Sequence, residues 1–171
     1  RIVGYDDIKN DLKNKFIFDS IIKDKVSDKA TVPNAMLFYG PTGNGKTTFA
    51  IALAEQALMT PYIVDASEMT KEDAMNMIEN YAFQSKQNYE KSENKQRSII
   101  IVNEADTLTN QNSPVLNRFK NLIADCSKEY KCTLFLTTNH PLHIDKDILS
   151  KDITPFKVPV APPNDIIAKK I

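Results

Sequence analysis

The feature that most constrains this chain is the loop Gly40-Pro41-Thr42-Gly43-Asn44-Gly45-Lys46-Thr47, which holds three of its four glycines. The apolar stretch 35–39 precedes the loop, and residues 46–58 carry apolar side chains at helical spacing. This order predicts a strand, a glycine-rich turn and a helix in direct succession. Glycines concentrated there let the backbone wrap so that successive N–H groups can point inward.

The loop matches the phosphate-binding pattern G-x-x-x-x-G-K-S/T in full. Its backbone N–H groups and the start of the following helix favour bound phosphate. The Lys46 ammonium can reach the β- and γ-phosphates, and the Thr47 hydroxyl can coordinate Mg²⁺. The alternative is a turn that only reverses the chain. We expect nucleotide contacts from Pro41, Thr42, Gly43, Asn44, Gly45, Lys46, Thr47 and Thr48.

Predicted strands and helices alternate along the chain, which is typical of an α/β protein with a parallel sheet. The expected strands are 35–39, 61–66, 98–102, 133–137 and 156–158. The expected helices are 6–24, 46–58, 70–87, 114–125 and a short one near 145–150, and the polar residues 86–97 are expected to form a solvated loop or a frayed helix end.

Length and charge narrow the function classes. A chain of 171 residues fits one domain, and 22 basic residues balance 22 acidic ones, so no global charge favours nucleic acid or membrane binding. Neither a membrane-spanning run nor a signal peptide is visible, and the first residue is Arg1, so we expect a cytoplasmic fragment of a longer protein. Cys126 and Cys132 are expected to be free thiols, since no zinc-site spacing is present.

A second polar site follows the strongly apolar run 98–102, in the order Asn103, Glu104, Ala105, Asp106. Ligands of open α/β sheets bind at the carboxyl ends of the strands. Glu104 is therefore our candidate for polarising an attacking water. A helix-capping or merely solvated glutamate is the alternative.

Together these motifs resemble the AAA+ ATPases, with the loop at 40–47 as Walker A, residues 99–106 as Walker B and residues 134–139 as sensor 1. The resemblance spans about residues 2–163 and implies that Asn139 hydrogen-bonds the γ-phosphate or the lytic water. A loop amide capping a strand is the alternative for Asn139. The opening segment resembles the part that this family places against adenine, which implies further nucleotide contacts from Val3, Gly4 and Tyr5.

The resemblance also implies a fold, cofactors and an assembly. The fold would be a P-loop three-layer α/β sandwich around a central parallel five-stranded sheet, occupying residues 1–161. Residues 162–171 would begin a helical lid that is cut off. The cofactors would be ATP or ADP with Mg²⁺, and the full-length protein would work as a homo- or hetero-oligomeric ring.

Position 103 departs from the family pattern, which usually has Asp where this chain has Asn103. With Thr47, Asn103 would face Mg²⁺, but an amide supplies no negative charge. We expect weaker Mg²⁺ organisation and slower turnover, with nucleotide binding retained. Asp106 could compensate in part, although local capping fits it better.

The chain also departs from the family pattern at the position of the arginine that usually reaches into the site of a neighbouring subunit. Lys151 stands where clamp-loader-like members carry it, and lysine lacks the planar fork of arginine. Arg118 is the other candidate for acting in trans, with an exposed helix arginine as the alternative. Both assignments rest on the resemblance.

The branch within the family and the activity stay open. Residues 104–139 resemble the clamp-loader branch, whereas the opening segment resembles the AAA remodelling branch. An ATP-hydrolysing motor that remodels a protein or nucleic-acid assembly is the first hypothesis. The rival is a nucleotide-responsive regulatory or structural subunit with little turnover, favoured by Asn103 and Lys151. A small-molecule kinase is disfavoured, because such enzymes need a mobile arginine-bearing lid and the arginines here are too few and badly placed.

Overall fold

The computed structural model describes residues 32–41, 45–57, 59, 61–93, 95–154 and 156–160. The expected helix at 6–24 and the expected lid boundary at 162 lie outside these residues. The described elements, in chain order, are β1 (Ala35–Tyr39), α2 (Lys46–Gln56), β2 (Pro61–Asp65), η3 (Ala66–Glu68), α3 (Lys71–Lys91), β3 (Ser98–Asn103), α4 (Asp106–Thr109), α5 (Leu116–Asp125), β4 (Cys132–Thr138), η4 (Pro141–His143) and β5 (Phe156–Pro159).

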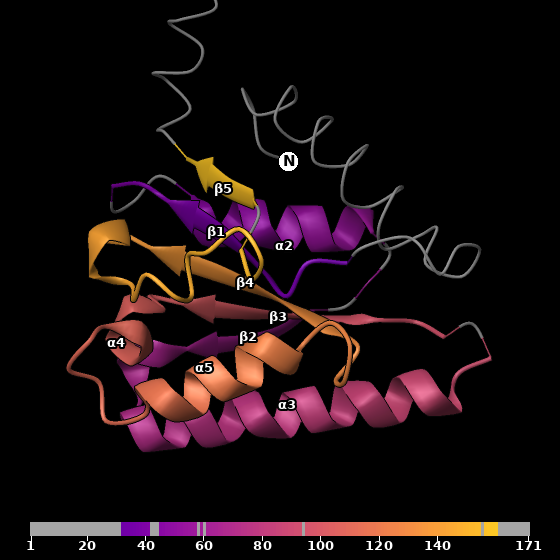
Figure 1. Cartoon of the computed structure of the whole chain (residues 1–171). Helices are drawn as coiled ribbons and strands as arrows, with labels where there is room; N and C mark the ends of the chain where they lie inside the picture. Colours follow the sequence, from indigo (N-terminus) through magenta and orange to yellow (C-terminus); the bar gives the residue numbers. More distant parts are fainter. Residues whose placement is uncertain are drawn as a thin grey trace, which may run out of the picture.

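The five strands form one parallel sheet in the order β2-β3-β4-β1-β5, which confirms the predicted sheet (Figure 1). Strand β4 lies between β1 and β3, although those two precede it in the chain. The polar residues that follow β1, β3 and β4 therefore meet at one edge, because the carboxyl ends of parallel strands share that edge.

Helices cover both faces of the sheet, which makes a three-layer sandwich. Helix α2 lies on one face, and α3 and α5 lie on the other (Figure 1). Alternate residues of each strand enter opposite cores because strand side chains have a period of two. In β1, Met36 and Phe38 pack in the core with α2, whereas Ala35 and Leu37 pack in the core with α3 and α5.

An aromatic cluster holds α2 against the centre of the sheet. The ring of Phe38 lies 5.3 Å from that of Phe135 on β4 and 5.6 Å from that of Phe49 on α2. All three side chains are fully buried. Because α2 starts directly after the glycine-rich loop, this cluster also fixes where the end of the loop lies.

Helix α3 ends at Lys91, four residues past its predicted end at 87, and so includes the first part of the polar segment 86–97. Its start is capped, since the Thr70 hydroxyl accepts a hydrogen bond from the Asp73 amide at 3.1 Å. Its polar second half is held by tertiary contacts. The buried Ser85 hydroxyl donates to the Lys131 carbonyl at 3.1 Å, and Lys86 pairs with Glu129 at 2.5 Å.

The short helix expected near 145–150 is wrong. The structure has the 3₁₀ turn η4 followed by separate turns over 146–149. The Ile148 and Leu149 amides turn back to the Asp145 carbonyl at 3.1 and 3.3 Å, but the next amide, Ser150, bonds to Asp147 at 3.4 Å, so a single turn forms and does not continue as a helix. The segment is anchored from outside, since the Asp145 amide donates to the Thr109 carbonyl at 2.8 Å and the Thr154 hydroxyl donates to the Ile148 carbonyl at 2.6 Å.

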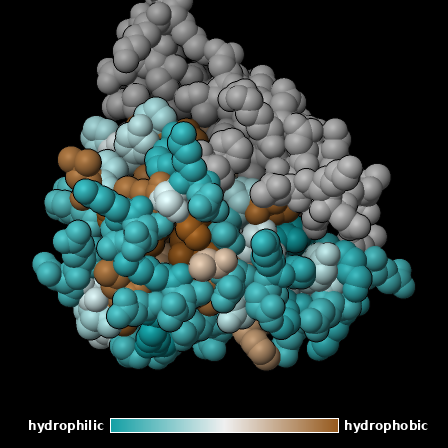
Figure 2. All heavy atoms as spheres, viewed as in Figure 1, coloured by the Kyte–Doolittle hydropathy of each residue, from teal (hydrophilic) through white to brown (hydrophobic). Residues whose placement is uncertain are grey.

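The surface of the described residues is largely hydrophilic on the face shown in Figure 2. Large apolar side chains that are exposed in this part of the chain are Ile63, Phe83 and Leu142. None of the described helices combines the length and the apolar character needed to cross a membrane. Cys126 and Cys132 are buried and unbridged, as expected.

Candidate functional site

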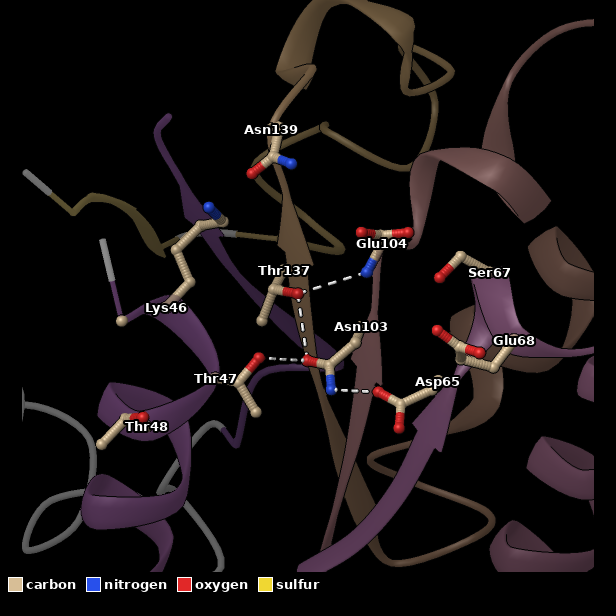
Figure 3. Close-up of a pocket in the computed structure, with 11 residues that line it drawn as sticks. Lys46, Thr47, Thr48, Asp65, Ser67, Glu68, Asn103, Glu104, Thr137 and Asn139 are labelled. Atoms are coloured by element: carbon tan, nitrogen blue, oxygen red, sulfur yellow. Dashed lines mark hydrogen bonds between the residues drawn. The ribbon is translucent and has the colours of Figure 1, made fainter. Parts of the chain in front are cut away.

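A pocket of about 460 Å³ opens at the carboxyl edge of the sheet. Figure 3 shows side chains from the start of α2 and from the ends of β2, β3 and β4 around it. Its lining consists of Gly45, Lys46, Thr47, Thr48, Asp65, Ser67, Glu68, Asn103, Glu104, Thr137 and Asn139. The structure thus brings the described part of the predicted phosphate loop together with Asn103, Glu104 and Asn139.

Gly45 turns the loop into α2. Its backbone is left-handed, with φ 82° and ψ 26°, and its carbonyl accepts the hydrogen bond from the Phe49 amide at 2.9 Å. Residues with a Cβ rarely adopt this conformation. The third glycine of the motif is therefore required by the backbone at the point where the helix begins.

Replacing Gly45 with Ala is expected to lower the free energy of unfolding by about 1–2 kcal/mol, the cost of a left-handed alanine. A Cβ at this position would meet no atom within 4 Å, so the cost comes from the backbone and not from crowding. Urea denaturation measures it. Gly45→Asn is the matched control and should lose less, because Asn tolerates this conformation better. Equal stability of Gly45→Ala and the unaltered chain would contradict this account.

The Lys46 side chain is buried at the loop. Its ammonium donates hydrogen bonds to the carbonyls of Gly40 at 3.1 Å and Pro41 at 2.9 Å. Burial lowers the pKa of Lys46, and the Glu104 carboxylate raises it in part. An anion at the pocket would favour the charged ammonium further. Lys46 is thus placed to meet negative charge where little water screens it.

Hydroxyl groups from two elements converge on the Asn103 amide oxygen. Thr47 Oγ1 donates to Asn103 Oδ1 at 2.8 Å, and Thr137 Oγ1 donates to the same atom at 3.1 Å. Since a hydroxyl has one hydrogen to donate, the Thr47 oxygen keeps its lone pairs for another partner. This arrangement orients Thr47 as a ligand for a cation in the pocket.

The other side of the Asn103 amide faces β2. Asn103 Nδ2 donates to Asp65 Oδ1 at 2.6 Å, and both residues end their strands in direct register (Figure 3). Sequence patterns alone did not indicate the pocket residues Asp65, Ser67, Glu68 and Thr137. Asp65 could have been found, because a polar residue that ends an apolar strand lies at the same edge as Asn103.

Glu104 follows β3 with a left-handed backbone at φ 54°. Its amide donates to Thr137 Oγ1 at 3.2 Å, which holds this unusual conformation against β4. Non-glycine residues in this region are uncommon and often mark functional sites. The carboxylate is exposed and lines the pocket, so it can meet water there.

Asn139 comes directly after β4 and lines the pocket on the side away from Asp65 (Figure 3). Asp106 does not line it. The Asp106 carboxylate instead accepts the hydrogen of Thr138 Oγ1 at 2.7 Å and so ties α4 to the end of β4. This local structural role leaves Asp106 poorly placed to compensate for Asn103.

The two candidates for action on a neighbouring subunit lie away from the pocket lining. Arg118 on α5 is bound by Glu72, Asn76 and Glu79 of α3, with the Asn76 bond at 2.8 Å. Lys151 is exposed in a turn. The expected contacts Val3, Gly4, Tyr5, Thr42, Gly43 and Asn44 lie outside the described residues.

Comparison with known proteins decides the family. Residues 36–160 match the family described as "ATPase family associated with various cellular activities (AAA)", from the second residue of β1 to the residue after β5. The chain belongs to the AAA family.

Relatives of this AAA domain include two curated proteins. It is 27% identical over 115 residues to spastin of Dictyostelium discoideum, across 66% of this chain, and 29% identical over 110 residues to an ATPase-like fidgetin of Schizosaccharomyces pombe, across 63%. Each match covers 16% of the relative's own length. A structural match is the AAA domain of FIGL-1, solved in complex with ADP, at a TM-score of 0.71 and 19% identity. That match covers 93% of this chain and 53% of the other, and it shows a shared fold.

The AAA pocket has the donor set that a magnesium nucleotide needs. Thr47 offers an oriented hydroxyl oxygen, Asp65 and Glu104 offer carboxylates, and Lys46 offers a positive charge. Within the described part of the chain, no three His, Cys, Asp or Glu side chains gather closely enough to hold a metal by themselves. Mg²⁺ takes one or two protein oxygen ligands together with phosphate oxygens and water, and the Thr47 hydroxyl and the two carboxylates are ligands of that kind.

Proposed function

We propose that this AAA domain binds ATP with Mg²⁺ and hydrolyses it, and that the full-length protein uses the cycle to remodel a protein or nucleic-acid assembly. One observation carries the first part. A single pocket collects Lys46, Thr47, Glu104 and Asn139 from three different segments of the chain. The ADP bound by the structurally similar AAA domain of FIGL-1 supports the choice of nucleotide.

Each residue has a role that follows from its chemistry. Lys46 exchanges its carbonyl partners for the β- and γ-phosphates and offsets their charge. Glu104 orients and polarises the attacking water, and Asn139 hydrogen-bonds the γ-phosphate or that water. Mg²⁺, when bound beside Thr47, neutralises charge that develops on the phosphate oxygens. Metal contacts are assigned to Thr47 and, through a water, to Asn103.

The remaining nucleotide contacts rest on the motifs. We assign the phosphate wrap to the loop from Pro41 to Thr48, and the adenine contact to Val3, Gly4 and Tyr5. Residues 1–161 would then form the nucleotide-binding core and residues 162–171 the start of a lid. These assignments predict that changes at Tyr5 affect nucleotide affinity more than the rate of hydrolysis.

Lys46→Ala tests the proposal. We expect the alanine variant to bind ATP about tenfold to a hundredfold more weakly, because hydrogen bonds to charged groups contribute roughly 1.5–3 kcal/mol and about 1.4 kcal/mol is tenfold. Titration of a fluorescent ATP analogue measures the change. Lys71→Ala, which removes an exposed lysine at the start of α3, is the matched control. Unchanged affinity in Lys46→Ala would overturn the assignment of the loop.

A second candidate function is a nucleotide-responsive regulatory subunit with little turnover. The neutral amide of Asn103 favours it, since a full charge is missing at that position, and so does Lys151. A steady-state ATPase assay on the full-length protein separates the two. Turnover that disappears in Lys46→Ala supports the motor, and binding without turnover supports the regulatory subunit.

We propose a ring as the assembly of the full-length protein, by analogy with the family. Lys151 is then the freer candidate for reaching a neighbour, because it is exposed. Arg118 would first have to leave Glu72, Asn76 and Glu79. The same contacts give Arg118 an alternative role in packing α5 against α3.

A further inference from the structure

We propose that Asp65 supplies the negative charge that AAA proteins usually carry at the position of Asn103, and that it acts on the Mg²⁺ water shell through the Asn103 amide. This rests on the proposed function, since it concerns the magnesium nucleotide in the same pocket. Asp65 is a positioning residue in this scheme. In this scheme the negative charge lies at the end of β2, and the end of the neighbouring strand β3 carries a neutral amide.

The sheet itself places the two side chains together. Asp65 and Asn103 are partners in the parallel register of β2 and β3, so their side chains leave the sheet on the same side. The 2.6 Å bond from Asn103 Nδ2 to Asp65 Oδ1 joins them directly. Thr47, Asn103 and Asp65 thus form one continuous chain of hydrogen bonds.

The Asn103 amide couples the hydroxyl of Thr47 to the carboxylate of Asp65. Its oxygen accepts from Thr47 and Thr137, and its nitrogen donates to Asp65. A carboxylate at the donor end polarises the amide and strengthens its oxygen as an acceptor. The Asn103 oxygen that faces Thr47 therefore carries more negative partial charge than the amide would have without Asp65.

Other carboxylates are less well placed for this role. Asp106 is bound by Thr138 and does not line the pocket. Glu104 lies on the strand end that faces Lys46 and is assigned to the attacking water. Asp65 is exposed and forms no ion pair with any described lysine or arginine, so its charge is available to the pocket.

Asn103→Asp should not restore the site if Asp65 carries its charge. A carboxylate at 103 would lack the N–H that now binds Asp65, and two carboxylate groups would face each other across the present 2.6 Å contact. The substitution alone therefore adds repulsion and does not repair the site. Asp65→Asn combined with Asn103→Asp keeps one carboxylate and one amide and exchanges their strands.

The experiment measures the Mg²⁺ concentration that gives half of the Mg²⁺-dependent gain in affinity for a fluorescent ATP analogue. We expect this concentration to rise about tenfold or more in Asp65→Asn, as is usual for residues behind a metal's immediate partners. Asn103→Asp should also raise it, and the double variant should return it toward the unaltered value. Affinity in excess EDTA should not fall in any of these variants.

Asp125→Asn, which neutralises an exposed carboxylate at the end of α5, is the control for loss of charge alone. Thermal melting of every variant shows whether it is folded, and the double variant keeps the test valid if one single variant is not. An unchanged Mg²⁺ requirement in Asp65→Asn, or a double variant worse than both single ones, would overturn the role of Asp65. An unaltered protein that binds no nucleotide, with or without Mg²⁺, would overturn the proposed function and this inference together.

Discussion

Replacing Glu104 with Gln is expected to slow ATP hydrolysis by about 10²- to 10⁴-fold while nucleotide binding is retained, as for the loss of a general base. Gln keeps the size of the side chain and its capacity for hydrogen bonds but cannot take a proton from water. Glu104 is exposed in the pocket, and its backbone is held at φ 54° by Thr137, so the substitution leaves the surrounding geometry in place.

Steady-state phosphate release measures the rate for this variant, and a fluorescent ATP analogue measures binding. Glu55→Gln, which alters an exposed carboxylate on α2, is the matched control and should keep the unaltered rate. The Glu104 carboxylate lies near enough to Lys46 to raise the pKa of that ammonium. Glu104→Gln removes this negative charge from the place where the phosphates would bind, so affinity for ATP should hold or increase. Hydrolysis at the unaltered rate would show that another group activates the water.

Replacing Phe135 with Ala is expected to lower the free energy of unfolding by about 3–5 kcal/mol, as for other large-to-small changes at buried phenylalanines. Phe135 is fully buried in the middle of β4, which lies between β3 and β1. Its ring packs edge-on to Phe38 at 5.3 Å. The cavity would open beneath α2, which begins at the phosphate loop.

Urea denaturation followed by circular dichroism measures this loss. Phe83→Ala is the control, because that ring is 57% exposed on α3 and its removal leaves no cavity. We also expect weaker nucleotide binding in Phe135→Ala, since α2 carries Lys46 and Thr47. A loss below about 1 kcal/mol, close to the effect of surface changes, would mean that the core between the sheet and α2 is less tightly packed than the structure indicates.

Sequence pattern was sufficient to predict the elements whose conformation depends mainly on their own residues. The phosphate loop could be predicted because Gly45 and Lys46 stand at fixed spacing between an apolar strand and a helix. Each predicted strand lies within one residue of the observed bounds at both ends, since continuous apolar runs need burial on both faces. Glu104 was predicted from its place after such a run, and Asn139 from the resemblance to the AAA+ ATPases.

Prediction failed where contacts between distant segments decide the conformation. Helix α3 runs four residues past its predicted end at 87, directly after Ser85 and Lys86 bind the segment before β4. Near 145–150 a single turn closes on the Asp145 carbonyl and goes no further, and bonds to Thr109 and from Thr154 anchor the segment. Arg118 is an ordinary helix arginine in the sequence, yet three side chains of α3 hold it.

The sequence alone predicted a phosphate loop, a polar site after an apolar strand, and an amide at position 103, where the resemblance implies a carboxylate. Only the tertiary structure decided that β2 lies beside β3 in a register that pairs Asp65 with Asn103. The physical reason is that strand order and register come from packing both faces of a sheet, which no local pattern encodes. That pairing brings a carboxylate back to the site where position 103 lacks one.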